Sequence, residues 1–118
     1  MIFVIDDDVI MARCVARACE KNGLKTQIFG DAITAMNALE KGLPEMIFLD
    51  ILLSGPDGFT FLNELVSYSD TMKIPVVVIS SLKFSEKDLR DYGVVGVLDK
   101  MTMTPEEIQG YARKYAGC

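Results

Sequence analysis

The stretch VVVI at residues 76–79 is apolar at every position, so a strand formed here presents apolar side chains on both faces. Strands of this kind are typical of the centre of a parallel sheet, where helices cover each face. Working outward, short β-rich runs recur at Ile2–Ile5, Lys25–Phe29, Met46–Leu49, Pro75–Ile79 and Gly96–Leu98. Helical spacing of apolar residues lies between and after them, at about Val9–Asn22, Ala32–Lys41, Phe59–Tyr68, Glu86–Tyr92 and Pro105–Tyr115.

This alternation of five strands and five helices predicts an α/β fold. We expect a parallel sheet with right-handed crossovers and helices on both faces. Residues that favour helix ends support the boundaries: glycines that should stop helices are Gly23, Gly42 and Gly93, and candidate N-caps are Asp8, Asp31, Ser85 and Thr104. No linker, repeat or low-complexity segment interrupts the pattern, so residues 1–118 are expected to form one domain.

Composition excludes several classes of function. Half of the 118 residues are hydrophobic and a quarter are charged, as in an ordinary globular chain. The net charge of −5 and the scattered Lys and Arg residues argue against direct binding to nucleic acid or to an anionic membrane. No apolar run reaches membrane-spanning length and no signal segment opens the sequence, so no membrane partner is expected.

The three cysteines do not form a disulfide framework. Cys14 and Cys19 are five positions apart, which places them on different faces of a helix, and Cys118 is the last residue. An odd number of cysteines without a CxxC pair suits a reducing, cytoplasmic setting. The absence of His and of a Cys cluster disfavours a zinc site.

Polar residues stand at the carboxyl ends of four expected strands. The first strand ends in Asp6 and Asp7, the third in Asp50, the fourth in Ser80, and the fifth is followed by Lys100. In a parallel sheet these ends meet at one edge, where such sheets bind their ligands. Three carboxylates at close quarters raise one another's pKa unless a cation neutralises them, and oxygen ligands without His or Cys suit Mg²⁺. A carboxylate beside Mg²⁺, with a lysine and a hydroxyl nearby, is equipped to accept a phosphoryl group.

These motifs together resemble the receiver domain of two-component response regulators, over nearly the whole chain. The resemblance rests on VIDDD at 4–8, IFLD at 47–50 with the following ILLSGPDG, PVVVIS at 75–80, and Lys100. It implies the flavodoxin-like receiver fold, with strand order 2-1-3-4-5. It also implies the following site: Asp50 as phospho-acceptor, Ser80 and Lys100 as its catalytic partners, and Asp6, Asp7, Asp50 and the backbone carbonyl of Leu52 as ligands of Mg²⁺.

The same resemblance implies the partners. A histidine kinase or a phosphotransfer protein would supply the phosphoryl group, and the domain would then switch its binding to an output partner or output domain. Members of the family commonly use the fourth helix, fifth strand and fifth helix as their output face, and a dimer through this face is one expectation. Such a domain is not an enzyme beyond its own phosphotransfer and slow autodephosphorylation.

The sequence also departs from the family pattern. Met101 follows Lys100 where the family usually has Pro, Ser54 stands where another Pro is usual, and Val97 replaces the usual aromatic residue of the fifth strand. The segment from Ser80 to Gly93 is short, which predicts a reduced or irregular fourth helix. Two alternatives therefore stay open beside the phospho-acceptor: a receiver-like interaction module that acts without phosphorylation, and a Mg²⁺-dependent hydrolase with an Asp nucleophile.

Overall fold

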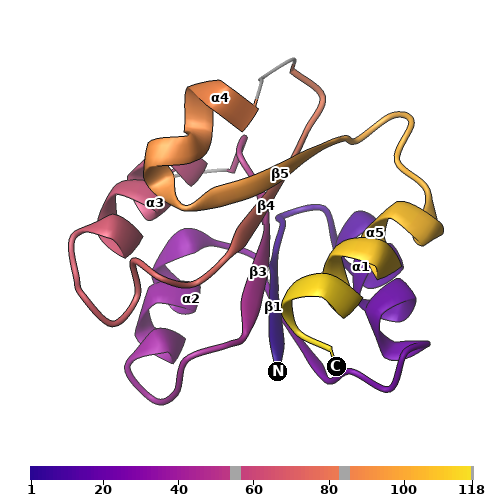
Figure 1. The fold of residues 1–118 in the computed structure, drawn as a ribbon, viewed down its shortest axis with the longest axis horizontal. Coiled ribbons are helices and arrows are strands. Elements are labelled where there is room, and N and C mark those ends of the chain that lie inside the picture. Colours follow the sequence, from indigo (N-terminus) through magenta and orange to yellow (C-terminus); the bar gives the residue numbers. More distant parts are fainter. Residues whose placement is uncertain (54–56, 83–85, 118) are drawn as a thin grey trace.

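The computed structural model describes residues 1–53, 57–82 and 86–117, and its elements follow the expected alternation (Figure 1). The strands are β1 (Ile2–Ile5), β2 (Thr26–Phe29), β3 (Met46–Asp50), β4 (Val76–Ser80) and β5 (Val94–Asp99). The helices are α1 (Val9–Glu20), α2 (Ala32–Leu39), α3 (Gly58–Val66), α4 (Glu86–Leu89) and α5 (Pro105–Tyr115), with a 3₁₀ turn, η1 (Arg90–Tyr92), after α4.

All strand pairs are parallel, in the order β2-β1-β3-β4-β5. The predicted fold class and strand order are therefore confirmed. The stretch that begins at Val76 is buried at every position of β4, as expected for a central strand. The pairing of β4 with β5 contains one register shift between Val76 and Val77, and β5 begins at Val94, earlier than the predicted start at Gly96.

Two apolar cores lie on the two faces of the sheet. On one face, buried residues of α2 and α3 pack with Leu89 of α4; on the other, α1 and α5 pack against the opposite sides of the same strands. The apolar side of α5 faces the core that contains α1: Ile108 and Ala112 are buried, and Tyr111 and Tyr115 pack against this core. Gly96 lets the Tyr111 ring approach β5, because a Cβ at this position would lie 2.4 Å from the ring.

Helix caps agree with the sequence where the structure describes them. The Asp8 carboxylate accepts hydrogen bonds from the backbone N–H groups of Ile10 and Met11, and the Asp31 carboxylate accepts one from Thr34. Thr104 and Glu107 form a reciprocal capping box at the start of α5. The candidate N-cap Ser85 lies outside the described residues.

The described part of the fourth helix is short, and the expectation of a reduced helix before Gly93 stays a prediction because residues 83–85 lie outside the described residues. The four α-helical residues that the structure describes, Glu86–Leu89, continue as the three-residue η1 turn, which is capped by Gly93 with a left-handed φ of 78°. The Lys100–Met101 peptide bond is trans, as are the other described peptide bonds. None of the described helices combines the length and the apolar character needed to cross a membrane.

Candidate metal centre

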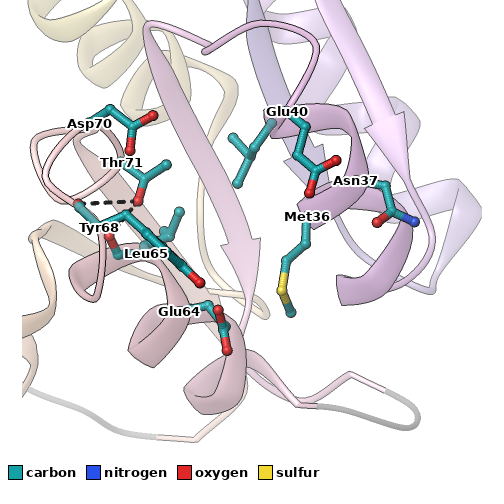
Figure 2. Close-up of a pocket in the computed structure, with 9 residues that line it drawn as sticks. Met36, Asn37, Glu40, Glu64, Leu65, Tyr68, Asp70 and Thr71 are labelled. Carbon is teal, nitrogen blue, oxygen red and sulfur yellow. Dashed lines mark hydrogen bonds between the residues drawn. The ribbon is translucent and has the colours of Figure 1, made fainter.

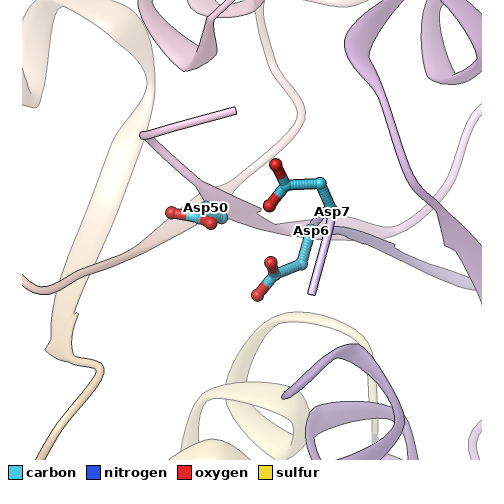
Figure 3. A group of neighbouring side chains, drawn as sticks. All are labelled: Asp6, Asp7 and Asp50. Carbon is cyan, nitrogen blue, oxygen red and sulfur yellow. The ribbon is translucent and has the colours of Figure 1, made fainter. Parts of the chain in front are cut away.

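Three carboxylates meet where β1 and β3 end (Figure 3). The two strands are adjacent and in parallel register, with Ile5 paired to Leu49, so the residues that follow leave the sheet side by side. Asp6, Asp7 and Asp50 each offer an oxygen, and these oxygens lie within 4.8 Å of one another. The structure thus brings together the three side chains that the sequence selected as metal ligands.

Lys100 places a positive charge against this cluster. Its Nζ lies 3.1 Å from Oδ2 of Asp50 and 3.5 Å from Oδ2 of Asp6. Burial alone would lower the pKa of Lys100, but the hydrogen bond to Asp50 and the negative charges of Asp6 and Asp50 outweigh it and raise the pKa. The ammonium group therefore stays protonated and offsets part of the negative charge.

The Asp6 carboxylate is buried, and burial makes its charged form unfavourable. Its side chain is only 3% exposed, and Oδ1 accepts a hydrogen bond from the Asp8 N–H at 2.9 Å. Oδ2 is buried without a hydrogen-bond partner among the described residues. Burial, helped by the nearby charge of Asp50, raises the pKa of Asp6 to about 6, although the Asp8 N–H and Lys100 act in the opposite direction. The Lys100 ammonium, 3.5 Å from Oδ2, pairs with this oxygen by charge but gives it no hydrogen bond, so Oδ2 could still coordinate a hard cation.

Asp50 is held at the end of β3 and is 4% exposed. Its Oδ1 accepts the backbone N–H of Leu52 at 3.1 Å, while Oδ2 faces Lys100. The backbone of Ile51, the residue after Asp50, is in turn held by α3, because the Gly58 N–H donates to the Ile51 carbonyl at 3.0 Å. A Cβ on Gly58 would lie 2.6 Å from the Ile51 Cα, so only glycine permits this approach. The sequence showed the DG turn at 57–58 but no signal of its contact with Ile51.

Ser80 ends β4. This strand lies between β3, which ends at Asp50, and β5, which is followed by Lys100. The side chain is 1% exposed, and its Oγ accepts the Leu82 N–H at 2.9 Å, which leaves the hydroxyl proton free for another acceptor. The Ser80 carbonyl accepts the Lys100 N–H at 3.0 Å and so ties the two polar residues together through the backbone.

Two apolar residues follow the polar residues closely in the sequence. Leu52 and Leu82, which follow Asp50 and Ser80 by two positions, are each about half exposed. The part of the Leu52 carbonyl as a metal ligand stays a prediction. Val97 is partly buried against the core formed with α2 and α3, and Ser54 lies outside the described residues.

Comparison with known proteins gives one consistent result. The sequence profile of the response regulator receiver domain matches residues 2–113. The phosphate regulon transcriptional regulatory protein PhoB of Escherichia coli is 32% identical over 89 residues, which cover 75% of this chain and 39% of PhoB. The chain spans less than half the length of the curated relatives that it matches first.

Two solved structures are similar in fold to this chain over nearly its whole length. The receiver domain of NtrX from Brucella abortus has a TM-score of 0.85 and 28% identity, with 98% of this chain and 97% of that chain covered. The Mn²⁺-bound form of the response regulator Rcp1 has a TM-score of 0.80 and 23% identity, with 99% and 95% covered.

Proposed function

The chain belongs to the response regulator receiver family, and from this premise we propose that Asp50 accepts a phosphoryl group in a Mg²⁺-dependent reaction. A receiver domain is not a classical enzyme, because the group that it takes up stays on its own side chain. The observation that carries the proposal is the convergence of three carboxylate oxygens within 4.8 Å, with the Lys100 ammonium 3.1 Å from Asp50. We propose that residues 1–118 form one receiver domain.

The acidic cluster can bind a divalent metal, and its donor set supports Mg²⁺ in particular. Asp6, Asp7 and Asp50 supply oxygen ligands only, and the buried Oδ2 of Asp6 accepts no hydrogen bond from the described residues and has the Lys100 ammonium no closer than 3.5 Å. The fold relative Rcp1 has been crystallised with Mn²⁺, another divalent ion that takes oxygen ligands. We propose that the Leu52 carbonyl completes the protein ligands. Bound Mg²⁺ would neutralise negative charge on the phosphoryl oxygens.

The reaction uses the positions of the side chains as follows. An Asp50 carboxylate oxygen attacks the phosphorus of a phosphohistidine, the P–N bond breaks, and the leaving imidazole takes a proton from water. Lys100 then moves its ion pair from the Asp50 carboxylate to a phosphoryl oxygen. The Ser80 hydroxyl, whose oxygen accepts the Leu82 N–H, donates its own hydrogen bond to another phosphoryl oxygen. The product is an acyl phosphate on Asp50.

Receiver domains interact with histidine kinases, and we propose a histidine kinase or a phosphotransfer protein as the donor here. Because the chain spans less than half of its first curated relatives, its output is also a proposal. We propose that phosphorylation switches binding to an output partner or output domain through α4, β5 and α5, and that any dimer uses this face. We propose a cytoplasmic location, where these donors act.

The second candidate is an interaction module that keeps the fold without phosphorylation. Met101 and Val97 favour it, because both depart from the residues that usually follow the lysine and respond to the phosphoryl group. Such a module would bind its partner through the same surface, formed by α4, β5 and α5, but would not need Asp50 to react.

Intact-mass measurement with acetyl phosphate and Mg²⁺ separates the candidates. We expect a phosphate-sized gain in the wild type that is absent from Asp50→Asn and present in Asp99→Asn, a matched change at the end of β5. A wild type that gains no mass with acetyl phosphate or with a phosphorylated kinase domain refutes phospho-acceptance. Continuous release of phosphate from small phosphate esters would instead favour the hydrolase alternative.

A further inference from the structure

A groove separates the carboxyl-terminal parts of α2 and α3 (Figure 2). Its volume is about 410 Å³, within the range of sites that hold small ligands or a few side chains. The apolar part of the lining comes from Met36, Leu39, Leu65 and the Tyr68 ring. The groove is therefore an uncovered apolar surface of limited and defined size.

The groove lies at the end of the domain opposite to the acidic cluster. In a parallel sheet with crossover helices, each helix runs against its strands, so helix carboxyl ends lie beside strand amino ends. Asp50 stands at the carboxyl end of β3, whereas Glu40 and Glu64 mark the carboxyl ends of α2 and α3. Occupation of the groove thus needs no contact with the phosphorylation site.

Negative charge surrounds the apolar lining. Glu40, Glu64 and Asp70 line the groove, all three are exposed, and none takes part in an ion pair among the residues that the structure describes. No Lys or Arg occurs among the described lining residues. The rim consequently attracts cations rather than anions.

The wall that carries Tyr68 is held in place without a ligand. Thr71 is 8% exposed, and its Oγ1 donates to the Leu65 carbonyl at 2.6 Å, which fixes the turn after α3 against the end of the helix. The Tyr68 side chain is 59% exposed beside this anchored turn. A wall fixed in advance lowers the entropic cost of binding.

We propose that this groove is a docking site for a basic amphipathic segment of a partner protein. Apolar side chains of the segment contact Met36 and Leu65, and its Lys or Arg side chains pair with Glu40 and Glu64. The exposed Tyr68 ring offers a face for one of these cations. An amphipathic segment in an apolar groove is a recurrent mode of recognition, and the acidic rim selects its charge. This contact goes beyond phospho-acceptance and is independent of it.

Short synthetic peptides test the proposal, with nuclear magnetic resonance titration of the labelled protein as the readout. One set carries Leu, Met or Phe anchors with Lys or Arg; a second replaces the cations by Glu, and a third replaces the anchors by Ser. We expect the first set alone to bind and to shift the amide signals of residues 36–40 and 64–71. The affinity should be unchanged in Asp50→Asn.

Two charge reversals locate the contact. Glu64→Lys should weaken binding by about tenfold, because an attraction becomes a repulsion. Glu106→Lys, the same change on α5 at the other face of the sheet, should leave the affinity unaltered. No binding by any basic peptide, equal binding of the acidic set, or equal weakening by both variants would overturn the proposal. Concentration-dependent shifts of the groove signals without peptide would overturn it in favour of a second copy of the chain.

Discussion

Replacing Gly58 by Ala tests whether α3 positions the loop that follows Asp50. A Cβ at this position would lie 2.6 Å, 2.8 Å and 3.0 Å from the Cα, O and C atoms of Ile51. All three are backbone atoms, so no side-chain rotation relieves the contact. Because ordinary carbon contacts are ~3.5–4.0 Å, helix and loop must separate by roughly 1 Å.

The displacement acts on both stability and the metal site. Overpacking of this kind costs about 1–3 kcal/mol of the free energy of unfolding. The shifted residue lies between Asp50 and Leu52, whose N–H holds the Asp50 carboxylate at 3.1 Å. Residues that orient metal ligands typically change the affinity by about 10–100-fold, so we expect Mg²⁺ affinity to fall by at least about tenfold.

The assay combines urea unfolding, followed by circular dichroism because the chain has no Trp, with calorimetric Mg²⁺ titration. Gly110→Ala in α5 is the matched control: a Cβ there meets nothing within 4 Å, so this variant should gain up to ~1 kcal/mol and bind Mg²⁺ normally. If Gly58→Ala loses stability but retains wild-type Mg²⁺ affinity, α3 does not position the site. If it loses neither, the contact with Ile51 has no consequence.

Other expectations concern single side chains. Because the pKa of Asp6 is raised from 3.8 to about 6, the folded state binds the proton more tightly than the unfolded chain. The stability contributed by this proton is complete below pH 3.8 and is lost as the pH rises through about 6, by on the order of 3 kcal/mol. Metal-free Asp6→Asn should lack this loss in urea unfolding at each pH; an unchanged pH dependence would refute it. Leu52→Asn and Leu82→Glu should each shorten the lifetime of phosphorylated Asp50 after donor removal, because polar groups can orient the attacking water; equal decay in the wild type would exclude shielding by the leucines. Burial raises the pKa of the Cys19 thiol to about 12, so iodoacetamide should modify exposed Cys14 and spare Cys19 in the folded protein, as peptide mapping can show; equal labelling would contradict the packing of α1.

The sequence by itself determined the order of elements and the composition of the site. Continuous apolar runs, helical periodicity and capping residues are local signals, so strands such as Val76–Ser80 and caps such as Asp31 can be found from neighbouring residues alone. Once the sheet is parallel, its carboxyl ends must share one edge, which is why Asp6, Asp7 and Asp50 could be grouped without coordinates. The family resemblance supplied the strand order, which the local patterns leave open.

Only the tertiary structure decided how closely these groups approach. The burial of an Asp6 oxygen that accepts no hydrogen bond from the described residues, and the 3.1 Å contact of Lys100 with Asp50, depend on packing between segments far apart in the chain. Gly58 against Ile51, and the groove with an acidic rim between α2 and α3, arise in the same way. A sequence pattern specifies which side of an element is apolar. Distances, burial and the resulting pKa values depend on where the other elements lie. Contact energies change when atoms move by a few tenths of an ångström, and electrostatic energies change when charges move by a few ångströms.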